Sequence, residues 1–275
     1  MILAPRSCPS RPGLAITTLI GRTNRQYTAV RVTVIGCSPA WPDPGGAHSG
    51  YLVDDPAAGN TTGILLDCGP GVLARLRERD GWPHVDAVVI THFHLDHWGD
   101  LVPWVWGTFY GLGRREAHPE LWLPPGGSAF LAEIGVHLGF PDMFERAFRL
   151  REYAESTPFE VGGFEVSALR LPHYRLVTYG LRVRNTASVL AYSGDSGPDD
   201  RLVALAQDAD LFLCEATLRR GVDDGEPRGH LSADEALAAA ATARARRTVL
   251  IHRPVELPTP DGVERAYDGL VLNVA

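Results

Sequence analysis

The chain has 275 residues, 45% hydrophobic and 21% charged, and is long enough to form a globular core without disulfides or a structural metal. All 26 basic residues are arginine, and the formal net charge is −7. The absence of lysine excludes Schiff-base chemistry, Ser–Lys nucleophiles and the lysine of a phosphate-binding P-loop, and the negative charge argues against a broad surface for polyanions.

Residues 1–29 show no regular periodicity and contain three prolines, so we expect a loosely ordered extension. Residues 30–275 contain no linker or repeat and are predicted to form a single domain. No apolar run approaches the roughly 18 residues of a membrane span, and no secretory signal is evident, so we expect a cytoplasmic protein. The four cysteines are scattered without a CxxC pair, which argues against a cysteine-based zinc site.

The pattern of apolar residues predicts an α/β protein. Alternating or continuous apolar runs predict strands at residues 30–35, 51–53, 63–67, 87–90, 121–123, 164–171, 178–183, 189–192, 211–214 and 248–251. Helices are expected at residues 71–79, 128–138, 199–207 and 232–245, the last opening with a capping box at Ser232 and Glu235. This order indicates two stacked mixed sheets covered by helices.

A histidine-rich segment, His92-Phe93-His94-Leu95-Asp96-His97, follows the predicted buried strand at residues 87–90. In an extended chain His92 and His94 point the same way, and Asp96 and His97 at the following turn can face a second point nearby. Imidazole and carboxylate groups in this arrangement favour two adjacent ions of zinc or a neighbouring first-row metal. The alternative is an exposed polar loop, but active sites commonly lie on loops after buried strands.

This motif resembles the hallmark His-x-His-x-Asp-His of the metallo-β-lactamase superfamily. Leu66-Asp67-Cys68-Gly69 is similar to the strand-end stretch whose aspartate supports the metal histidines in that family. The resemblance covers nearly everything from residue 30 onward. It implies an αββα sandwich, in which two mixed β-sheets are flanked by helices.

The resemblance also implies the remaining metal ligands, His173, Asp195 and His252. The first site would then comprise His92, His94, His173 and Asp195, and the second Asp96, His97, Asp195 and His252. We expect two zinc ions, with manganese or iron as alternatives, and a metal-bridging hydroxide as the nucleophile.

The order of the later motifs resembles the phosphodiesterase branch of the superfamily, which includes ribonuclease Z. The match makes His230, in Gly229-His230-Leu231-Ser232, the candidate general acid and Glu215 its orienting partner, and Asp96 completes the predicted catalytic residues. A solvated histidine before a helix is the alternative for His230.

Asp195 follows His173 by only 22 residues, which leaves no room for the RNA-gripping arm of ribonuclease Z. With a net charge of −7, the chain also lacks the basic surface that transfer RNA requires. We therefore expect a small phosphodiester substrate, such as a cyclic nucleotide, and neither transfer RNA nor a membrane as a partner.

Two further groups of residues have open roles. An aromatic run after the metal motif either packs in the core or forms a stacking wall for a base or aryl group; it comprises Trp98, Trp104, Trp106, Phe109 and Tyr110. Three arginines near His230 either bind a phosphate or lie in a solvated loop; they are Arg219, Arg220 and Arg228.

The leading hypothesis is therefore a dinuclear metal-dependent phosphodiesterase. The alternative is a carboxylic ester, thioester or lactone hydrolase on the same metals, because one fold hosts many chemistries. A non-catalytic binding protein is a third hypothesis, and a complete ligand set argues against it. The sequence leaves the natural substrate open, and a homodimer is an assembly that it allows.

Overall fold

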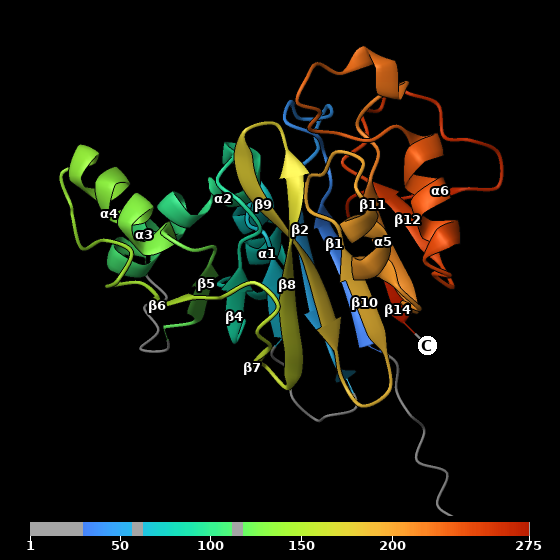
Figure 1. Ribbon diagram of the computed structural model, residues 1–275. Coiled ribbons are helices and arrows are strands. Elements are labelled where there is room, and N and C mark those ends of the chain that lie inside the picture. The colour runs from blue at the N-terminus through green and yellow to red at the C-terminus, as the bar shows by residue number, and fades with distance from the viewer. Residues whose placement is uncertain (1–29, 57–62, 112–117, 275) are drawn as a thin grey trace, which may run out of the picture.

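The computed structural model describes residues 30–56, 63–111 and 118–274, arranged as two seven-stranded sheets packed face to face (Figure 1). The first sheet has the order β14 (Val271–Val274), β1 (Val30–Gly36), β2 (Gly50–Asp54), β3 (Gly63–Leu66), β4 (Ala87–Val89), β5 (Glu120–Leu123), β6 (Arg149–Glu152). The second has the order β13 (Glu264–Arg265), β12 (Thr248–Ile251), β11 (Leu211–Glu215), β10 (Val189–Tyr192), β9 (Leu176–Arg184), β8 (Phe164–His173), β7 (Phe159–Val161).

Helices cover the outer face of each sheet. Helices α1 (Val72–Asp80), α3 (Leu101–Tyr110) and α4 (Gly127–His137) share a hydrophobic cluster with the first sheet. Helices α5 (Asp200–Ala206) and α6 (Ala233–Thr242) share another with the second sheet. A third cluster fills the space between the sheets. These four layers confirm the predicted αββα sandwich.

The burial of strand β4 explains why residues 87–90 form a continuous apolar run. Val89 belongs to the cluster between the sheets, whereas Val88 packs under the outer helices. Both side chains are fully buried, as expected for a strand covered on both faces. The capping box of α6 is also confirmed, because the Ser232 and Glu235 side chains accept each other's backbone N–H groups.

Several elements were not predicted. Helix α3 was noted only as an aromatic run, and its Pro103 lies in the first helical turn, where a missing N–H costs little. Strand β6 is largely exposed, and β14 is a four-residue strand that pairs with β1 at the other end of the described chain. The predicted extension at residues 1–29 lies outside the described residues. Within the described ranges, no helix is long and apolar enough to span a membrane.

Candidate metal centre

The predicted metal ligands come from distant parts of the chain and meet at one edge of the two sheets, at the top of Figure 1. His92 and His94 follow β4, His173 ends β8, Asp195 follows β10, and His252 follows β12. Strands β10, β11 and β12 are parallel, so their carboxyl ends lie at the same edge. Ligand sites in α/β sheets form at such an edge.

A short helix, α2 (Leu95–Trp98), lies within the histidine-rich segment, at the place where a turn was expected. His94 is still extended, with φ −70° and ψ 140°, and the chain becomes helical at the next residue. This change of direction separates His92 and His94 from Asp96 and His97, so the two pairs face different points as predicted.

The structure brings all seven predicted ligands into two groups that share Asp195. In each group, one potential ligand atom from every residue lies within 4.8 Å of the others. The first group is His92, His94, His173 and Asp195, and the second is Asp96, His97, Asp195 and His252. Their nitrogen and oxygen donors are those that zinc, manganese and iron use in proteins.

Three buried polar atoms at the centre of these groups lack hydrogen-bond partners among the described residues: Nε2 of His92, Nε2 of His97 and Oδ1 of Asp195. Buried polar atoms normally have hydrogen-bond partners, so a cluster of three unpaired ones needs an explanation. Bound metal ions would provide it, because these are the atoms that a metal coordinates. The residues therefore fit the metal that the motif implies.

Two of the histidines are oriented through Asp67, which lies in the left-handed backbone region (φ 59°) after β3. The Asp67 carboxylate accepts hydrogen bonds from Nδ1 of His97 at 2.7 Å and from the Thr91 hydroxyl at 2.9 Å. The Thr91 oxygen in turn accepts from Nδ1 of His92 at 3.0 Å. Both imidazoles therefore hold Nδ1 away from the centre and present Nε2 to it.

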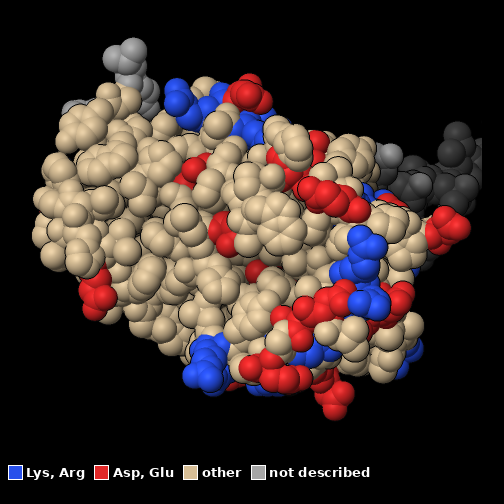
Figure 2. All heavy atoms as spheres, turned by 90° about the horizontal axis from the view of Figure 1, so that it is seen from above, with Lys and Arg blue, Asp and Glu red and all other residues tan. Residues whose placement is uncertain are grey.

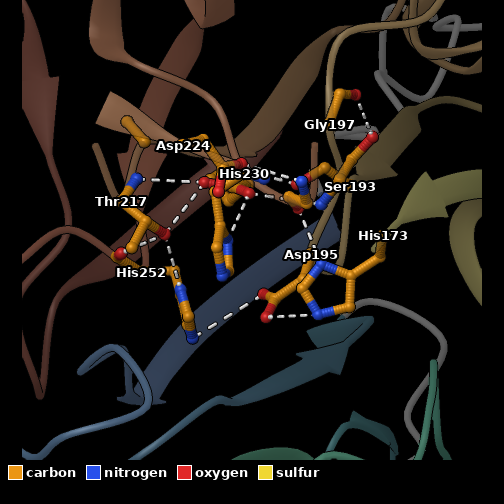
Figure 3. Close-up of polar contacts among 12 residues, drawn as sticks. His173, Ser193, Asp195, Gly197, Thr217, Asp224, His230 and His252 are labelled. Atoms are coloured by element: carbon orange, nitrogen blue, oxygen red, sulfur yellow. Dashed lines mark hydrogen bonds and ion pairs between the residues drawn. The ribbon is translucent and has the colours of Figure 1, made fainter. Parts of the chain in front are cut away.

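The other two buried histidine ligands, His173 and His252, are fixed in the same way. Nδ1 of His173 donates to the Gly229 carbonyl at 2.6 Å, and Nδ1 of His252 donates to the Thr217 hydroxyl oxygen at 2.9 Å. The Thr217 hydroxyl in turn donates a hydrogen bond to Oε2 of Glu215 at 2.9 Å. Four imidazoles are thus held with Nε2 directed at the centre. Figure 3 shows His173 and His252 on either side of Asp195.

Charge and burial act in opposite directions on these groups. Burial lowers the pKa of His92 well below the ordinary histidine value, which keeps the ring neutral as a metal requires. Burial alone would raise the pKa of Asp195, but His252 and His97 hold it well below its usual range. Burial opposes protonation of His97 as well, yet Asp195 and Asp67 raise its pKa well above the ordinary value.

His230 lies beside the metal groups and is paired with Glu215, the partner expected from the sequence. Nδ1 of His230 donates to Oε1 of Glu215 at 2.8 Å. Its ring stacks on His252 at 5.7 Å and meets His173 edge-on at 4.9 Å, so it reaches both groups (Figure 3). Burial alone would lower the pKa of His230, but the charge and hydrogen bond of Glu215 raise it to about 9. Glu215 therefore favours the cationic form of the ring at neutral pH.

Other candidates from the sequence lie elsewhere or are already paired. Trp98 and Trp104 are buried in the hydrophobic cluster between the first sheet and its helices. These two residues of the aromatic run therefore pack in the core and do not form a surface on which a substrate ring could stack. Arg228 forms a bidentate ion pair with Glu235, and Arg220 forms an ion pair with Asp223. Figure 2, which looks down on this edge, shows Arg toward the margin and acidic residues near the middle.

Sequence reasoning missed the residues that support the ligands. Thr91 and Thr217 each follow a strand and link a carboxylate to a metal histidine. The sequence signal that could have identified Thr91 is a threonine directly before a metal-binding histidine at the end of a strand. Tyr174 and Asp224 carry no such signal, because the tertiary structure alone places them beside His230.

Comparison with known proteins agrees with the fold and the site. The family profile of the beta-lactamase superfamily domain matches residues 62–253. An uncharacterised protein of Mycobacterium leprae is 33% identical over 274 residues, covering 96% of this chain and 90% of that protein. The probable metallo-hydrolase YhfI of Bacillus subtilis is 30% identical over 229 residues (82% and 87%), and a ribonuclease Z of Salinibacter ruber is 28% identical over 261 residues (74% and 79%).

Solved structures show the same fold. The crystal structure of YhfI from Bacillus subtilis superposes with a TM-score of 0.75 at 24% identity, covering 89% of this chain and 99% of the other. The short form of human tRNase Z gives a TM-score of 0.69 at 23% identity, with the same coverage. The family profile and the sequence relatives, together with the paired His and Asp groups, show that the chain belongs to the beta-lactamase superfamily, as a metallo-hydrolase.

Proposed function

We propose that this protein is a phosphodiesterase that hydrolyses a small phosphodiester at a centre of two metal ions. The observation that carries the proposal is the His230–Glu215 pair, which lies against both metal groups. Phosphodiesters with alkoxide leaving groups need a proton donor, and a cationic histidine is such a donor.

The metal ions, when bound by the seven residues, would supply a nucleophilic water and charge stabilisation for phosphorus chemistry. The chain's own residues supply the rest. Glu215 holds the proton on Nδ1 of His230, so the second proton is carried at Nε2. In the described chain, Nε2 makes no hydrogen bond, and the ring lies between His252 and His173. His230 can therefore donate to an oxygen that leaves from phosphorus at the centre.

The surroundings of the site favour a small substrate over transfer RNA. The segment from His173 to Asp195 is taken up by a two-residue turn, β9, a short connection and β10, with no inserted arm. The arginines nearest His230 that could meet a phosphate chain include Arg228 and Arg220, both engaged by carboxylates. Ribonuclease Z, the name of several relatives, denotes an enzyme that cleaves phosphodiesters, which supports the bond type rather than the substrate.

The decisive experiment is a leaving-group series on the metal-loaded His230→Ala variant. We expect metal content to stay at the wild-type level and the rate to fall roughly 10²–10⁴-fold for alkyl leaving groups, the usual contribution of a positioned acid. Loss should be much smaller for 4-nitrophenolate, which departs without a proton. His137→Ala, which removes an exposed histidine on α4, is the matched control.

A uniform loss across the series would show that His230 only binds or positions the substrate. Normal hydrolysis of every phosphodiester by the variant would remove the basis of the proposal. A carboxylic ester, thioester or lactone hydrolase on the same centre would then be the better explanation.

A further inference from the structure

Tyr174 occupies a strained position next to the metal centre. Strands β8 and β9 pair through His173 and Leu176, so Tyr174 and Arg175 form the whole turn between them. The φ angle of Tyr174 is +50°, in the left-handed region that favours glycine at the first position of such turns. A bulky aromatic residue persists in this region only where its surroundings hold it there, and such strain concentrates at functional sites.

Three contacts hold Tyr174 in place. Its hydroxyl donates to Oδ1 of Asp224 at 3.1 Å, and its backbone N–H donates to the Arg228 carbonyl at 3.2 Å. The ring lies over Gly229, where an added Cβ would come within 2.3 Å of ring atom Cε2. The ring therefore fits because residue 229 has no side chain.

The same carboxylate fixes the candidate acid. Oδ2 of Asp224 accepts the backbone N–H groups of Gly229 at 2.8 Å and His230 at 3.0 Å. Asp224 thus links the Tyr174 hydroxyl to the His230 backbone; Figure 3 shows Asp224 beside His230. These hydrogen bonds favour one position of the ring relative to the acid.

Tyr174 remains open to solvent, although its neighbour His173 is buried and His230 is only slightly exposed. Its centroid lies 5.0 Å from that of His173 and 5.5 Å from that of His230, and the residue is 41% exposed. Phe93, another aromatic residue of this region, instead packs on Phe130 at 4.3 Å. Tyr174 thus presents aromatic surface beside both the acid and the first metal group.

We propose that Tyr174 is the wall of a subsite that stacks a planar ring carried by the leaving side of the phosphodiester. The proposal rests on the proposed function, because a leaving oxygen that faces His230 directs its substituent past the adjacent Tyr174 ring. Aromatic side chains stack on any flat ring without requiring a particular hydrogen-bond pattern. The subsite therefore selects phosphodiesters whose leaving group carries a nucleobase or an aryl ring over those with a plain alkyl leaving group.

Binding of three phosphonates to the metal-loaded protein tests the subsite without turnover. Phenylphosphonate, cyclohexylphosphonate and methylphosphonate carry the same charge, and only the first has a planar ring. By titration calorimetry, we expect the wild type to bind phenylphosphonate more tightly than both of the others. Tyr174→Ala should weaken phenylphosphonate binding roughly 5- to 100-fold, the range seen when a stacking aromatic is removed, and should leave methylphosphonate binding unchanged.

Tyr174→Phe is the matched control, because it keeps the ring and loses only the hydroxyl bonded to Asp224. It should retain the preference for phenylphosphonate. If Tyr174→Ala folds poorly, Tyr174→Gly removes the ring with a residue suited to φ +50°. Equal binding of phenyl- and cyclohexylphosphonate by the wild type, or an unchanged preference in the ring-free variant, would overturn the subsite.

Failure of the proposed function has a different signature. If the wild type prefers phenylphosphonate through Tyr174 but hydrolyses no phosphodiester, the ring subsite is supported and the proposed reaction is refuted. If the wild type hydrolyses phosphodiesters and its ligand preference does not depend on Tyr174, the proposed reaction is supported and the subsite is refuted. Binding of none of the phosphonates would overturn both.

Discussion

Replacement of Glu215 by Gln should move the alkaline limb of the pH–rate profile to lower pH. The pKa of His230 is raised from the ordinary 6.5 to about 9, and the Glu215 carboxylate is the main cause of that rise. An amide at 215 carries no charge to stabilise the cation, so the pKa of His230 should fall from about 9 toward the ordinary histidine value of 6.5. An acid must be protonated to act, so activity is present below its pKa and lost as the pH rises through it.

The size of the effect follows from these two values. If the pKa returns fully to 6.5, the protonated fraction of His230 at pH 8 falls from about 0.9 to about 0.03, so kcat/KM should drop by up to about 30-fold. Below about pH 6 the two enzymes should nearly converge, because His230 is largely protonated in both. The displacement between the two alkaline limbs is the quantity to measure, because an effect of bound metal ions on the pKa of His230 is common to both proteins.

The assay is kcat/KM against pH with an alkyl phosphodiester, together with metal analysis, since Glu215 also contacts His252 through Thr217. Glu165→Gln is the control, because it removes an exposed carboxylate with the same change of charge. A profile for Glu215→Gln that falls equally at every pH, with the alkaline limb in place and metals retained, would refute the assignment of His230 and Glu215.

Three further predictions concern the metal ligands. His252→Ala should lower the metal content from about two equivalents to about one by elemental analysis, because His252 belongs to one group only; full retention would show that it is not a ligand. Asp67→Asn should weaken zinc affinity roughly 10–100-fold in a chelator competition, because His97 loses the acceptor that orients it; an unchanged affinity would contradict this role. Zinc binding to the stripped protein should release protons into weakly buffered solution and weaken as the pH falls, because the pKa of metal-free His97 is raised well above the ordinary value; binding without pH dependence would be inconsistent with that charge state.

The sequence predicted the parts of the molecule that local patterns encode. The buried run at residues 87–90 and the histidines after it locate a strand and the start of a metal site, because period-two geometry and ligand chemistry are both local. The ligands His173, Asp195 and His252 followed from family resemblance, since their convergence depends on the order and direction of strands β8 to β12 in the second sheet.

Features made by tertiary contacts could not be predicted from local patterns. Strand β14 exists because it pairs with β1, more than 200 residues away, and β6 has no buried alternation to reveal it. The role of Tyr174 depends on Asp224 and Gly229, which reach it from the loop before α6. A tyrosine after a histidine in a turn gives no sign of such partners.

The central claim is phosphodiester hydrolysis at a metal centre, and a substrate panel on metal-reconstituted protein tests it most directly. The panel compares bis(4-nitrophenyl) phosphate and a cyclic nucleotide with a lactone, a thioester and a carboxylic ester, before and after removal of metal by a chelator. We predict turnover of the phosphodiesters that is lost with the metal and restored by zinc, manganese or iron. Metal-dependent turnover of the lactone, thioester or carboxylic ester without turnover of either phosphodiester would contradict the account.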